Sequence, residues 1–538
     1  MSKAKTKLRS FDAFFELVLR HPYIFITLVC ALLFPLGFAE ASQIHEEHIV
    51  FEGILWAIGI AVLVMVGKPS KSSAVNLYLL ISSVMMILLF SLMVNENARH
   101  STMMFVPVAV GLFQLGAVMY VEKSLNVNRL IMLIFVLGAV VRYCYLLDHN
   151  CSQMQHDVGS FDGRSGHEAY IAYWYNNKIK MPDFDVSTRW QFYHPPLHHM
   201  LMAILLKIFT VFGMEIKTAQ EAIQILPMVY SSLSMVACYR IFKLIHLDGA
   251  GLAVASAVVC FHPTFIIWSG AYNNDMPATM FMLFAMLWTL KWYEKPTLKR
   301  ILPIALCVGF GMMSKLSAWM VAPAIAMVFL VVFIRNIKKP LPFIGQFAAF
   351  GVICAPTALW WQIRNLIKFD LPITYVPDPA SQSMSVKAVP MAQRLFDFSF
   401  SQFDFPFEAF TGYKSPYNEY NPLIGLLKTS VFDEDRTAWR FDALPTVLLF
   451  IVGLLAIVGF VFLIVWLCKK SVKPAFEIKA FFVIIFFTIM ISYYAFCFSF
   501  PYVCTENIRY CMPIIPILGI GIGYAVNTVT KCLRKQTQ

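Results

Sequence analysis

Long apolar runs separated by short polar stretches fill most of the chain. Runs of the length needed to cross a bilayer, about 17–25 residues, predict membrane-spanning helices. Such runs, one of them short, lie at 22–39, 50–66, 75–94, 101–120, 129–147, 222–242, 250–270, 275–292, 301–314, 316–334, 343–363, 443–467, 479–500 and 510–528. The pattern therefore predicts an all-α polytopic membrane protein with about fourteen transmembrane helices.

One further apolar run, 197–213, decides the topology. If it crossed the membrane, the three basic loops between 240 and 339 would face outside, against the preference of Lys and Arg for the cytoplasmic side. If it lies along the membrane surface, every basic loop falls inside. Those loops are 68–71, 123–129, 240–243, 291–300, 335–339, 469–473 and 531–535. We therefore predict an interfacial helix at 197–213 and cytoplasmic chain ends.

The same topology places three polar features outside: the loop 148–199, the short turn 272–275 and the segment 366–441. The first of these is the earliest long polar interruption, and we expect a short helix within it. The third is too long for an idle connector. We expect four parts: a four-helix extension at 1–124, a catalytic core at 125–365, an outer lid or acceptor loop at 366–441, and C-terminal transmembrane helices at 442–538.

Composition agrees with this fold class. The chain of 538 residues is 59% hydrophobic and only 14% charged, whereas soluble domains are about half apolar and a quarter charged. The net charge of +12 comes from short loops and the termini. It therefore reflects membrane topology and does not indicate nucleic-acid binding.

Asp157 is the candidate general base in the first outer loop. It follows His156 and precedes Val158, Gly159 and Ser160 at the membrane surface. A carboxylate in this position can take a proton from a hydroxyl as that hydroxyl attacks. Three rivals for the role lie nearby, and a solvated loop aspartate is the structural alternative. The rivals are Asp162, His167 and Glu168.

The stretch 191–199 places His194 before two prolines, at the start of the predicted interfacial helix. An imidazole there can bind a phosphate or a metal. His198 and His199 are adjacent and so point to different helix faces, which makes them a poor chelating pair.

Asp275 is the second candidate carboxylate. Asn274 and Asp275 start the predicted helix 275–292 and precede Pro277, a pattern that also fits simple helix capping. Because Asp275 is expected on the same side as Asp157, the two carboxylates could share one reaction, one as base and one orienting the substrate.

Three cations stand at the expected outer ends of helices: Lys315, Arg364 and Arg509. Basic residues are unusual on that side and need an anionic partner. A lipid phosphate would serve, and Arg offers it two parallel hydrogen bonds. Ion pairs of Arg509 with Glu506 and of Arg364 with Asp370 are the alternative.

The order of these features resembles the GT-C class of polytopic glycosyltransferases. The similarity runs from about residue 129 to 528, and its elements are the acidic first loop, Tyr193-His194-Pro195-Pro196-Leu197, His262-Pro263, Asn273-Asn274-Asp275, Gly311 to Lys315, Trp361 to Asn365, and Arg509-Tyr510 with Pro513 and Pro516. The chain looks like the family 39 branch, which holds protein O-mannosyltransferases, the aminoarabinose transferase of lipid A and RgtA/B/C/D-like bacterial proteins.

The resemblance implies an inverting transferase with the GT-C fold that uses a polyprenyl-phosphate sugar donor. Asp157 then matches the catalytic aspartate of the first loop, and Asp275 matches the second acidic residue. His194 falls where the aminoarabinose transferase carries a metal-ligating glutamate, which leaves a divalent metal open. Val158 departs from the acidic neighbour often found after the first aspartate. The substrate-binding set is Tyr193, His194, His167, Asn274, Lys315, Arg364 and Arg509.

The expected partners are the lipid-linked donor, a glycan, lipid or protein acceptor, and membrane lipids. We expect a bacterial cytoplasmic membrane as the location, with the site on its extracytoplasmic face. The main alternative is a polytopic transporter or lipid flippase. A polysaccharide polymerase or ligase and a non-catalytic scaffold are further alternatives. Ionisable residues gathered at the outer boundary favour the enzyme over a transporter, whose charges would lie at the bilayer midplane.

Overall fold

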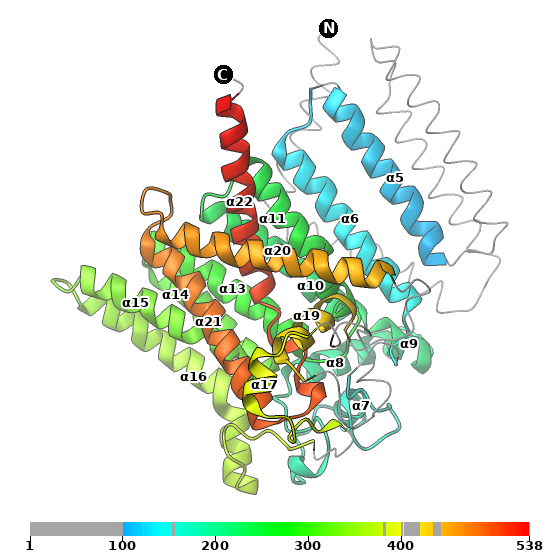
Figure 1. Ribbon diagram of the computed structural model, residues 1–538. Coiled ribbons are helices and arrows are strands. Elements are labelled where there is room, and N and C mark those ends of the chain that lie inside the picture. Colours follow the sequence, from blue (N-terminus) through cyan, green and yellow to red (C-terminus); the bar gives the residue numbers. More distant parts are fainter. Residues whose placement is uncertain are drawn as a thin grey trace.

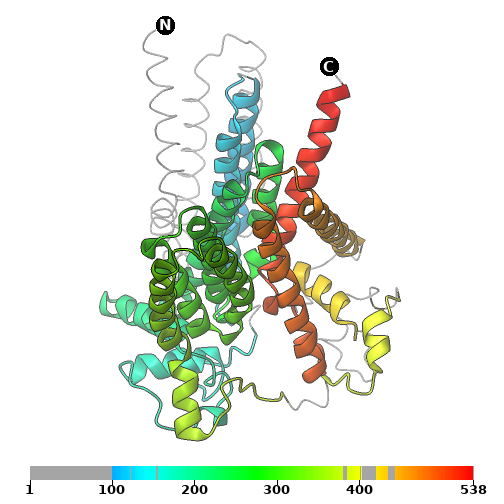
Figure 2. The same cartoon turned by 90° about the vertical axis from the view of Figure 1, so that its left-hand side faces the viewer.

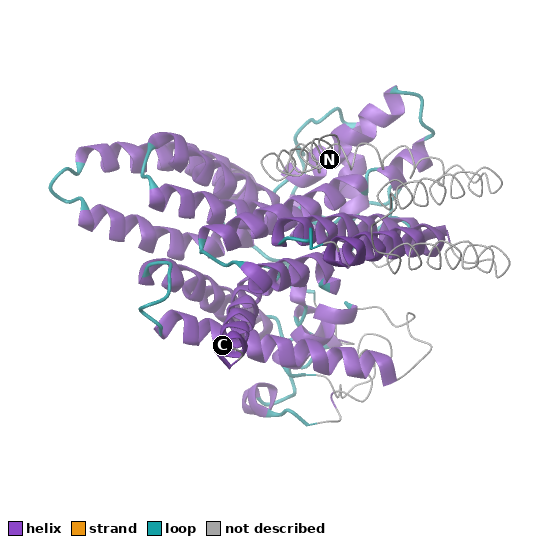
Figure 3. Ribbon diagram, turned by 90° about the horizontal axis from the view of Figure 1, so that it is seen from above, coloured by secondary structure: helices purple, strands orange, loops and turns teal. Residues whose placement is uncertain are grey.

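The computed structural model describes residues 100–121, 123–152, 156–379, 384–399, 402, 420–433 and 443–536. Within these segments the chain forms helices joined by loops and no strand, apart from an isolated antiparallel bridge between Ser385 and Tyr502 (Figure 3). The all-α prediction is confirmed. The predicted spans at 22–39, 50–66 and 75–94, and part of the outer segment 366–441, lie outside the described residues.

The long helices coincide with the predicted apolar runs. They are α5 (His100–Val121), α6 (Val127–Asp148), α10 (Ile225–Leu244), α11 (Gly249–Phe261), α13 (Asp275–Glu294), α14 (Leu298–Ser314), α15 (Ala322–Arg335), α16 (Leu341–Phe369), α20 (Ala443–Cys468), α21 (Phe476–Ser499) and α22 (Ile514–Gln536). Within the described residues, 7 helical stretches are long and apolar enough to cross a membrane. The protein is therefore a multi-pass membrane protein, and the total of about fourteen spans stays a prediction.

Most of the short helices gather at one end of the molecule, which we call the loop end. In Figure 1, α7, α8, α9 and α17 lie in the lower part, while the C-terminal end of α22 is at the top, and Figure 2 gives the same separation. The short elements are α7 (His167–Asn176), α8 (Leu197–Val211), α9 (Ile216–Ala222), α12 (Pro263–Ile267), α17 (Met391–Phe396), α19 (Pro422–Phe432) and the 3-10 turns η1 (Val186–Thr188), η2 (Leu316–Val321), η5 (Val503–Thr505) and η6 (Ile508–Tyr510).

The predicted span at 250–270 is wrong as one continuous helix. Helix α11 ends at Phe261, and the short α12 starts at Pro263. Proline has no N–H to continue the helix and restricts the residue before it. The carbonyls of Val259 and Cys260, released by the break, accept hydrogen bonds from Arg142 at 3.3 and 2.8 Å. A buried guanidinium from α6 thus stabilises the break.

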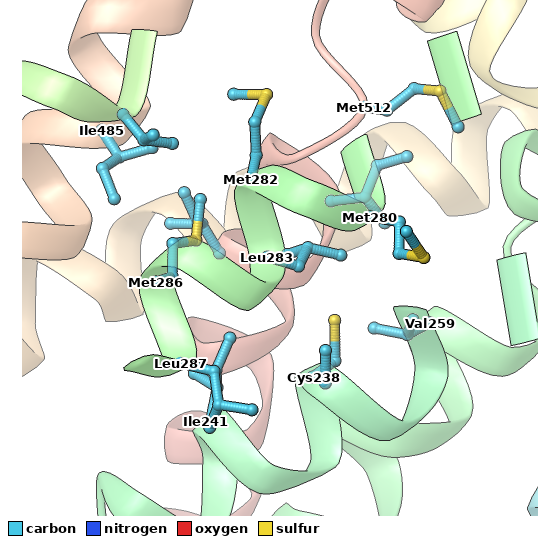
Figure 4. Close-up of a cluster of buried hydrophobic side chains, with 14 of the residues drawn as sticks. Cys238, Ile241, Val259, Met280, Met282, Leu283, Met286, Leu287, Ile485 and Met512 are labelled. Atoms are coloured by element: carbon cyan, nitrogen blue, oxygen red, sulfur yellow. The ribbon is translucent and has the colours of Figure 1, made fainter. Parts of the chain in front are cut away.

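Helix α13 lies at the centre of the core, packed against α10 and α14. Its buried Met280, Met282 and Met286 face neighbours that include Val259 of α11 and Ile485 of α21 (Figure 4). Unbranched methionines fill the irregular spaces between helices that cross at different angles. The result is one continuous apolar core beneath the loop end.

Small residues let α11, α20 and α22 approach closely. A Cβ on Gly251 would overlap the backbone of Gly523, and a Cβ on Gly521 would overlap the backbone of Gly459. Since apolar burial drives little association between helices in lipid, such backbone contact is a main source of their packing energy. This packing fixes the start of α22, next to the loop that carries Arg509.

Helix α8 does not have the length of a membrane span. Its 15 residues cover about 22 Å, less than the hydrocarbon core of about 30 Å. One face packs on α7 and α9, whereas the other exposes an apolar stripe at helical spacing. That stripe consists of Leu201, Ile204, Ile208, Val211 and Phe212. An exposed apolar stripe on a short helix is typical of an interfacial helix.

Candidate active site

A cavity of about 940 Å³ opens at the loop end. Its walls come from the 148–199 loop, the start of α13, Lys315 with η2, the ends of α16 and α21, the loop before α22, and part of the 366–441 segment. Eight of the predicted site residues line it: Asp157, His167, Tyr193, His194, Asn274, Asp275, Lys315 and Arg509. Segments hundreds of residues apart in sequence therefore meet at one place.

Arg364 is the predicted site residue that does not line this cavity. Its guanidinium donates to the Pro182 carbonyl and, at 2.7 Å, to Oδ1 of Asn365, and it lies over the rings of Trp361 and Phe369. These contacts fasten the first loop to the end of α16. The ion pair with Asp370, the predicted alternative, is not formed, because Arg364 instead satisfies its donors on backbone and amide oxygens.

Asp275 and Lys315 form a buried ion pair between Oδ1 and Nζ. The two residues meet because α13 and α14 are consecutive antiparallel helices, so the start of one lies beside the end of the other. Burial lowers the pKa of Lys315, while Asp275 acts in the opposite direction. Asn274 does not cap α13 with its side chain but donates to the Ser314 carbonyl at 2.8 Å. The simple capping interpretation of this motif is therefore wrong.

Asp157 faces Arg509 across 3.7 Å. The Asp157 side chain is 35% exposed, which leaves it open to the cavity, whereas that of Asp275 is 2% exposed. The predicted alternative, an ion pair of Arg509 with Glu506, is wrong, because Glu506 binds Arg394 at 2.9 Å. The cations are thus not isolated as the sequence suggested. Carboxylates neutralise Lys315 and Arg509, where the low dielectric makes a lone charge costly.

The backbone around Asp157 is held tightly. Asp157 has φ of 53°, in the left-handed region, which costs about 1–2 kcal/mol in a residue with a Cβ. Its carbonyl accepts from the His167 N–H at 3.1 Å, at the start of α7. Gly159 and Gly166, also at positive φ, approach so closely that a Cβ on either would collide with the other strand of the loop. The loop after Asp157 is therefore a packed structure.

A row of buried histidines extends from the cavity wall, where His167 lies, into the protein. His167 Nδ1 and His199 Nε2 are 2.8 Å apart, and His167 Nε2 faces the Asn273 amide nitrogen at 3.0 Å. His198 turns away from His199 and bonds to the Tyr272 carbonyl at 3.0 Å, which confirms that these neighbours point to different faces. Burial lowers the pKa of His167 and His199 well below the usual range, and that of His198 to about 4. These imidazoles are neutral at pH 7.

His194 stacks against the Tyr193 ring with centroids 4.2 Å apart, and its carbonyl accepts from the Tyr170 hydroxyl at 3.2 Å. Burial lowers its pKa, and Lys315 lowers it further. In the part of the chain that the structure describes, no three His, Cys, Asp or Glu side chains gather as a metal-ligand set. A metal role for His194 therefore stays a prediction.

Sequence reasoning missed two side chains of this site, Asp433 and Asn507. Asp433 ends α19 and lines the cavity, where its Oδ2 binds His156 Nε2 at 2.7 Å. Asn507 donates to the other oxygen of Asp433 at 3.0 Å. Asp433 begins a short acidic stretch after an apolar helix. In the sequence, this pattern looks like an ordinary solvent-exposed helix end. No local signal joins it to His156, which lies 277 positions earlier.

Residues 193–361 match the family model of dolichyl-phosphate-mannose-protein mannosyltransferases. The matched segment contains the cavity residues Tyr193, His194, Asn274, Asp275 and Lys315. No curated protein matches the chain. The family match over residues 193–361 and the all-helical membrane fold support the resemblance of this multi-pass membrane protein to glycosyltransferases of the GT-C class and of the mannosyltransferase type.

Proposed function

We propose that the protein is an inverting glycosyltransferase that moves a sugar from a polyprenyl-phosphate donor to an acceptor hydroxyl. Two carboxylate–cation contacts carry this proposal: Asp157 with Arg509, and Asp275 with Lys315. Both face one cavity at the loop end. Such a cavity offers a base to an acceptor and positive charge to a leaving phosphate. The family match supports the sugar-transfer chemistry.

Asp157 is the proposed base because it is the accessible carboxylate of the two. It takes the proton of the acceptor hydroxyl while that oxygen attacks the anomeric carbon. The new carbon–oxygen bond forms on one face of the sugar, and the bond to the phosphate oxygen breaks on the other, so the configuration inverts. The leaving polyprenyl phosphate keeps the electron pair. Asp275, fixed by Lys315, orients the substrate.

Lys315 and Arg509 are the proposed phosphate-binding residues. Lys315 Nζ lies 4.8 Å and Arg509 Cζ 4.9 Å from the centroid of the same Tyr510 ring. The two cations are close enough that Arg509 helps to lower the pKa of Lys315, after the larger effect of burial. An anion between them would relieve this repulsion, and it would grow more negative as the sugar leaves.

The apolar wall of the cavity supports a lipid-linked donor. Trp319 and Met320 of η2 line it together with Tyr493 and Phe496 of α21. Both elements belong to helical stretches that are long and apolar enough to cross a membrane. The first prenyl units would lie there, while the sugar occupies the polar part beside Tyr193, His194, His167 and Asn274. A nucleotide donor would have no use for such a wall.

The loop end is proposed to face outside, in a bacterial cell envelope. Each of α10, α13 and α15 starts at the cavity end and finishes away from it, at a basic group. The positive-inside preference then places the cavity on the extracytoplasmic side. In this topology 366–441 is the outer lid or acceptor segment, and 125–365 with 442–538 forms the core around the cavity.

Donor profiling tests the proposal. Purified full-length protein in nanodiscs receives radiolabelled mannose, glucose, galactose or arabinose, each linked to polyprenyl phosphate. The acceptors offered are a pool of Ser/Thr peptides and an extract of membrane glycolipids. Transfer from at least one lipid-linked donor, and none from the matching sugar nucleotides, is the expected result. Lipid-linked donors that are bound but never cleaved, in the presence of both acceptor classes, would contradict the proposal.

A further inference from the structure

Asp433 connects the two segments that supply the Asp157–Arg509 pair. One carboxylate oxygen binds His156 Nε2 at 2.7 Å, and the other accepts from Asn507 Nδ2 at 3.0 Å. His156 is the residue before Asp157. Asn507 in turn accepts the Arg509 N–H on its Oδ1 at 2.8 Å.

His156 is fixed in orientation as well as in position. Its ring stacks on Trp268, with centroids 5.2 Å apart and planes 11° from parallel. Its backbone carbonyl accepts from Asn273 at 3.0 Å. The peptide before Asp157 is therefore held by α19 and by the start of α13, and the peptide after it by the N-terminus of α7. Because Asp157 has a left-handed backbone, it depends on such flanking contacts to keep its place.

Asp433 itself is poorly placed to be a base. It is buried, with its residue 1% exposed, and each carboxylate oxygen already has a hydrogen-bond donor. Asp157, in contrast, is accessible from the cavity. We infer that Asp433 is a positioning residue: through His156 and Asn507 it holds the proposed base and the proposed phosphate-binding arginine at their working separation. This inference rests on the proposed function of Asp157.

The inference also gives α19 a role. Asp433 directly follows α19 within the outer segment 366–441, and α19 packs against α12 and η6. Asp433, the residue after the end of α19, therefore links the first loop to the loop before α22.

The test measures turnover of full-length protein in nanodiscs with radiolabelled mannosyl-phosphoryl-polyprenol, or with the donor that profiling selects. Asp433→Ala should lower kcat about a hundredfold, the usual effect of a displaced reacting group, and change the donor KM by less than about threefold. His156→Ala should do the same. Asp397→Ala is the matched control, because this outer-segment carboxylate binds Tyr420 and Ser399 and does not line the cavity.

A double variant separates positioning from general structure. Once Asp157→Asn has removed the base, Asp433→Ala should lower the residual turnover much less than it lowers native turnover, because only the positioning of Arg509 is then left to lose. Asp433→Asn should keep at least about a tenth of native kcat, because its amide can donate to the other tautomer of His156 and still accept from Asn507. This variant and His156→Ala keep the test open if Asp433→Ala does not fold.

Native kcat in Asp433→Ala and His156→Ala overturns the inference, and so does an equal drop in the Asp157→Asn background. Loss of all turnover in Asp433→Asn overturns it as well, since the charge and not the contact would then be needed. Native kcat in Asp157→Asn is a different result: it removes the proposed base itself, and the positioning role with it.

Discussion

Lys315 and Arg509 each share their charge with a carboxylate, so neither is a simple phosphate clamp. Each cation contacts its acidic partner, and the donor's phosphate is proposed to bind between the two cations. A bound phosphate therefore competes with a carboxylate for the same N–H groups. When the site is empty, the carboxylates keep the two cations paired. When the donor binds, its phosphate can take over these contacts.

Removal of either cation should weaken donor binding. A charge-assisted hydrogen bond contributes about 1.5–3 kcal/mol, so Arg509→Ala or Lys315→Met should raise the dissociation constant of the donor about 10- to 100-fold. A fluorescent polyprenyl-phosphate analogue titrated into nanodiscs measures this. Lys180→Ala removes an exposed cation away from the cavity and should have no effect. Unchanged affinity in both site variants would remove the phosphate role.

The neutral histidines should make the fold sensitive to acid. Their folded pKa lies below the unfolded value of about 6.5, so the unfolded state binds more protons as the pH falls. Stability should therefore be full above about pH 6.5 and decline toward pH 4, by about 1.4 kcal/mol per pH unit for each extra proton. Glu168 acts in the opposite direction, because burial raises its pKa to about 7, but one carboxyl opposes several imidazoles.

Thermal unfolding in nanodiscs between pH 7 and 5 checks this dependence. His198→Asn removes one titrating group, whose folded pKa is about 4, and should flatten the slope of Tm against pH by as much as one proton's contribution. His246→Gln replaces an exposed histidine away from the cavity and should leave the slope as it is. Equal slopes in the native protein and in His198→Asn would contradict the linkage.

At the scale of helices, apolar length located the long helices of the described residues. The run at 301–314 became α14, and 197–213 became the short surface helix α8. The break at Pro263 was missed because the run 250–270 stays apolar on both sides of it. The hydrogen bonds that make the break tolerable come from Arg142, which lies more than a hundred residues earlier. Contacts of this kind leave no local pattern.

For the site, too, the sequence predicted which segments meet but not which side chains pair. The topology predicted Asp157 and Asp275 on the same side of the membrane, and in the structure both line one cavity. Their partners could not be predicted, because an ion pair depends on which helix ends are neighbours. Lys315 meets Asp275 only through the α13–α14 packing, and Asp433 meets His156 only once α19 docks.

Helix α8 should lie in the membrane interface. Val211 and Phe212 are 69% and 85% exposed at its apolar end, where water contact would be costly and lipid contact favourable. A spin label on Val211→Cys should collide with oxygen more than with a water-soluble nickel chelate, at a depth just below the headgroups. A label on Lys180→Cys is the aqueous control. Equal accessibility to the nickel chelate at both positions would contradict the interfacial placement.

For the whole molecule, the topology predicts opposite faces for the two ends of the bundle. In sealed right-side-out vesicles, Lys180→Cys at the loop end should react with an impermeant maleimide. The exposed native Cys532 near the end of α22 should react only after the membrane is opened. Mass spectrometry assigns the labelled residue in each case. The reverse labelling pattern would show the opposite orientation in the membrane, with the cavity on the cytoplasmic face.

The central claim is that sugar transfer occurs in this cavity with Asp157 as the base, and Asp157→Asn tests it most directly. Asparagine keeps the shape of aspartate but cannot take the proton, so transfer from the lipid-linked donor should fall by about two to four powers of ten. Donor binding should persist, because the phosphate contacts come from other residues. Asp162→Asn is the matched control, since Asp162 is exposed and does not line the cavity, and it should transfer at close to the native rate. Native transfer by Asp157→Asn, with transfer abolished in Asp162→Asn or His167→Ala, would contradict the account.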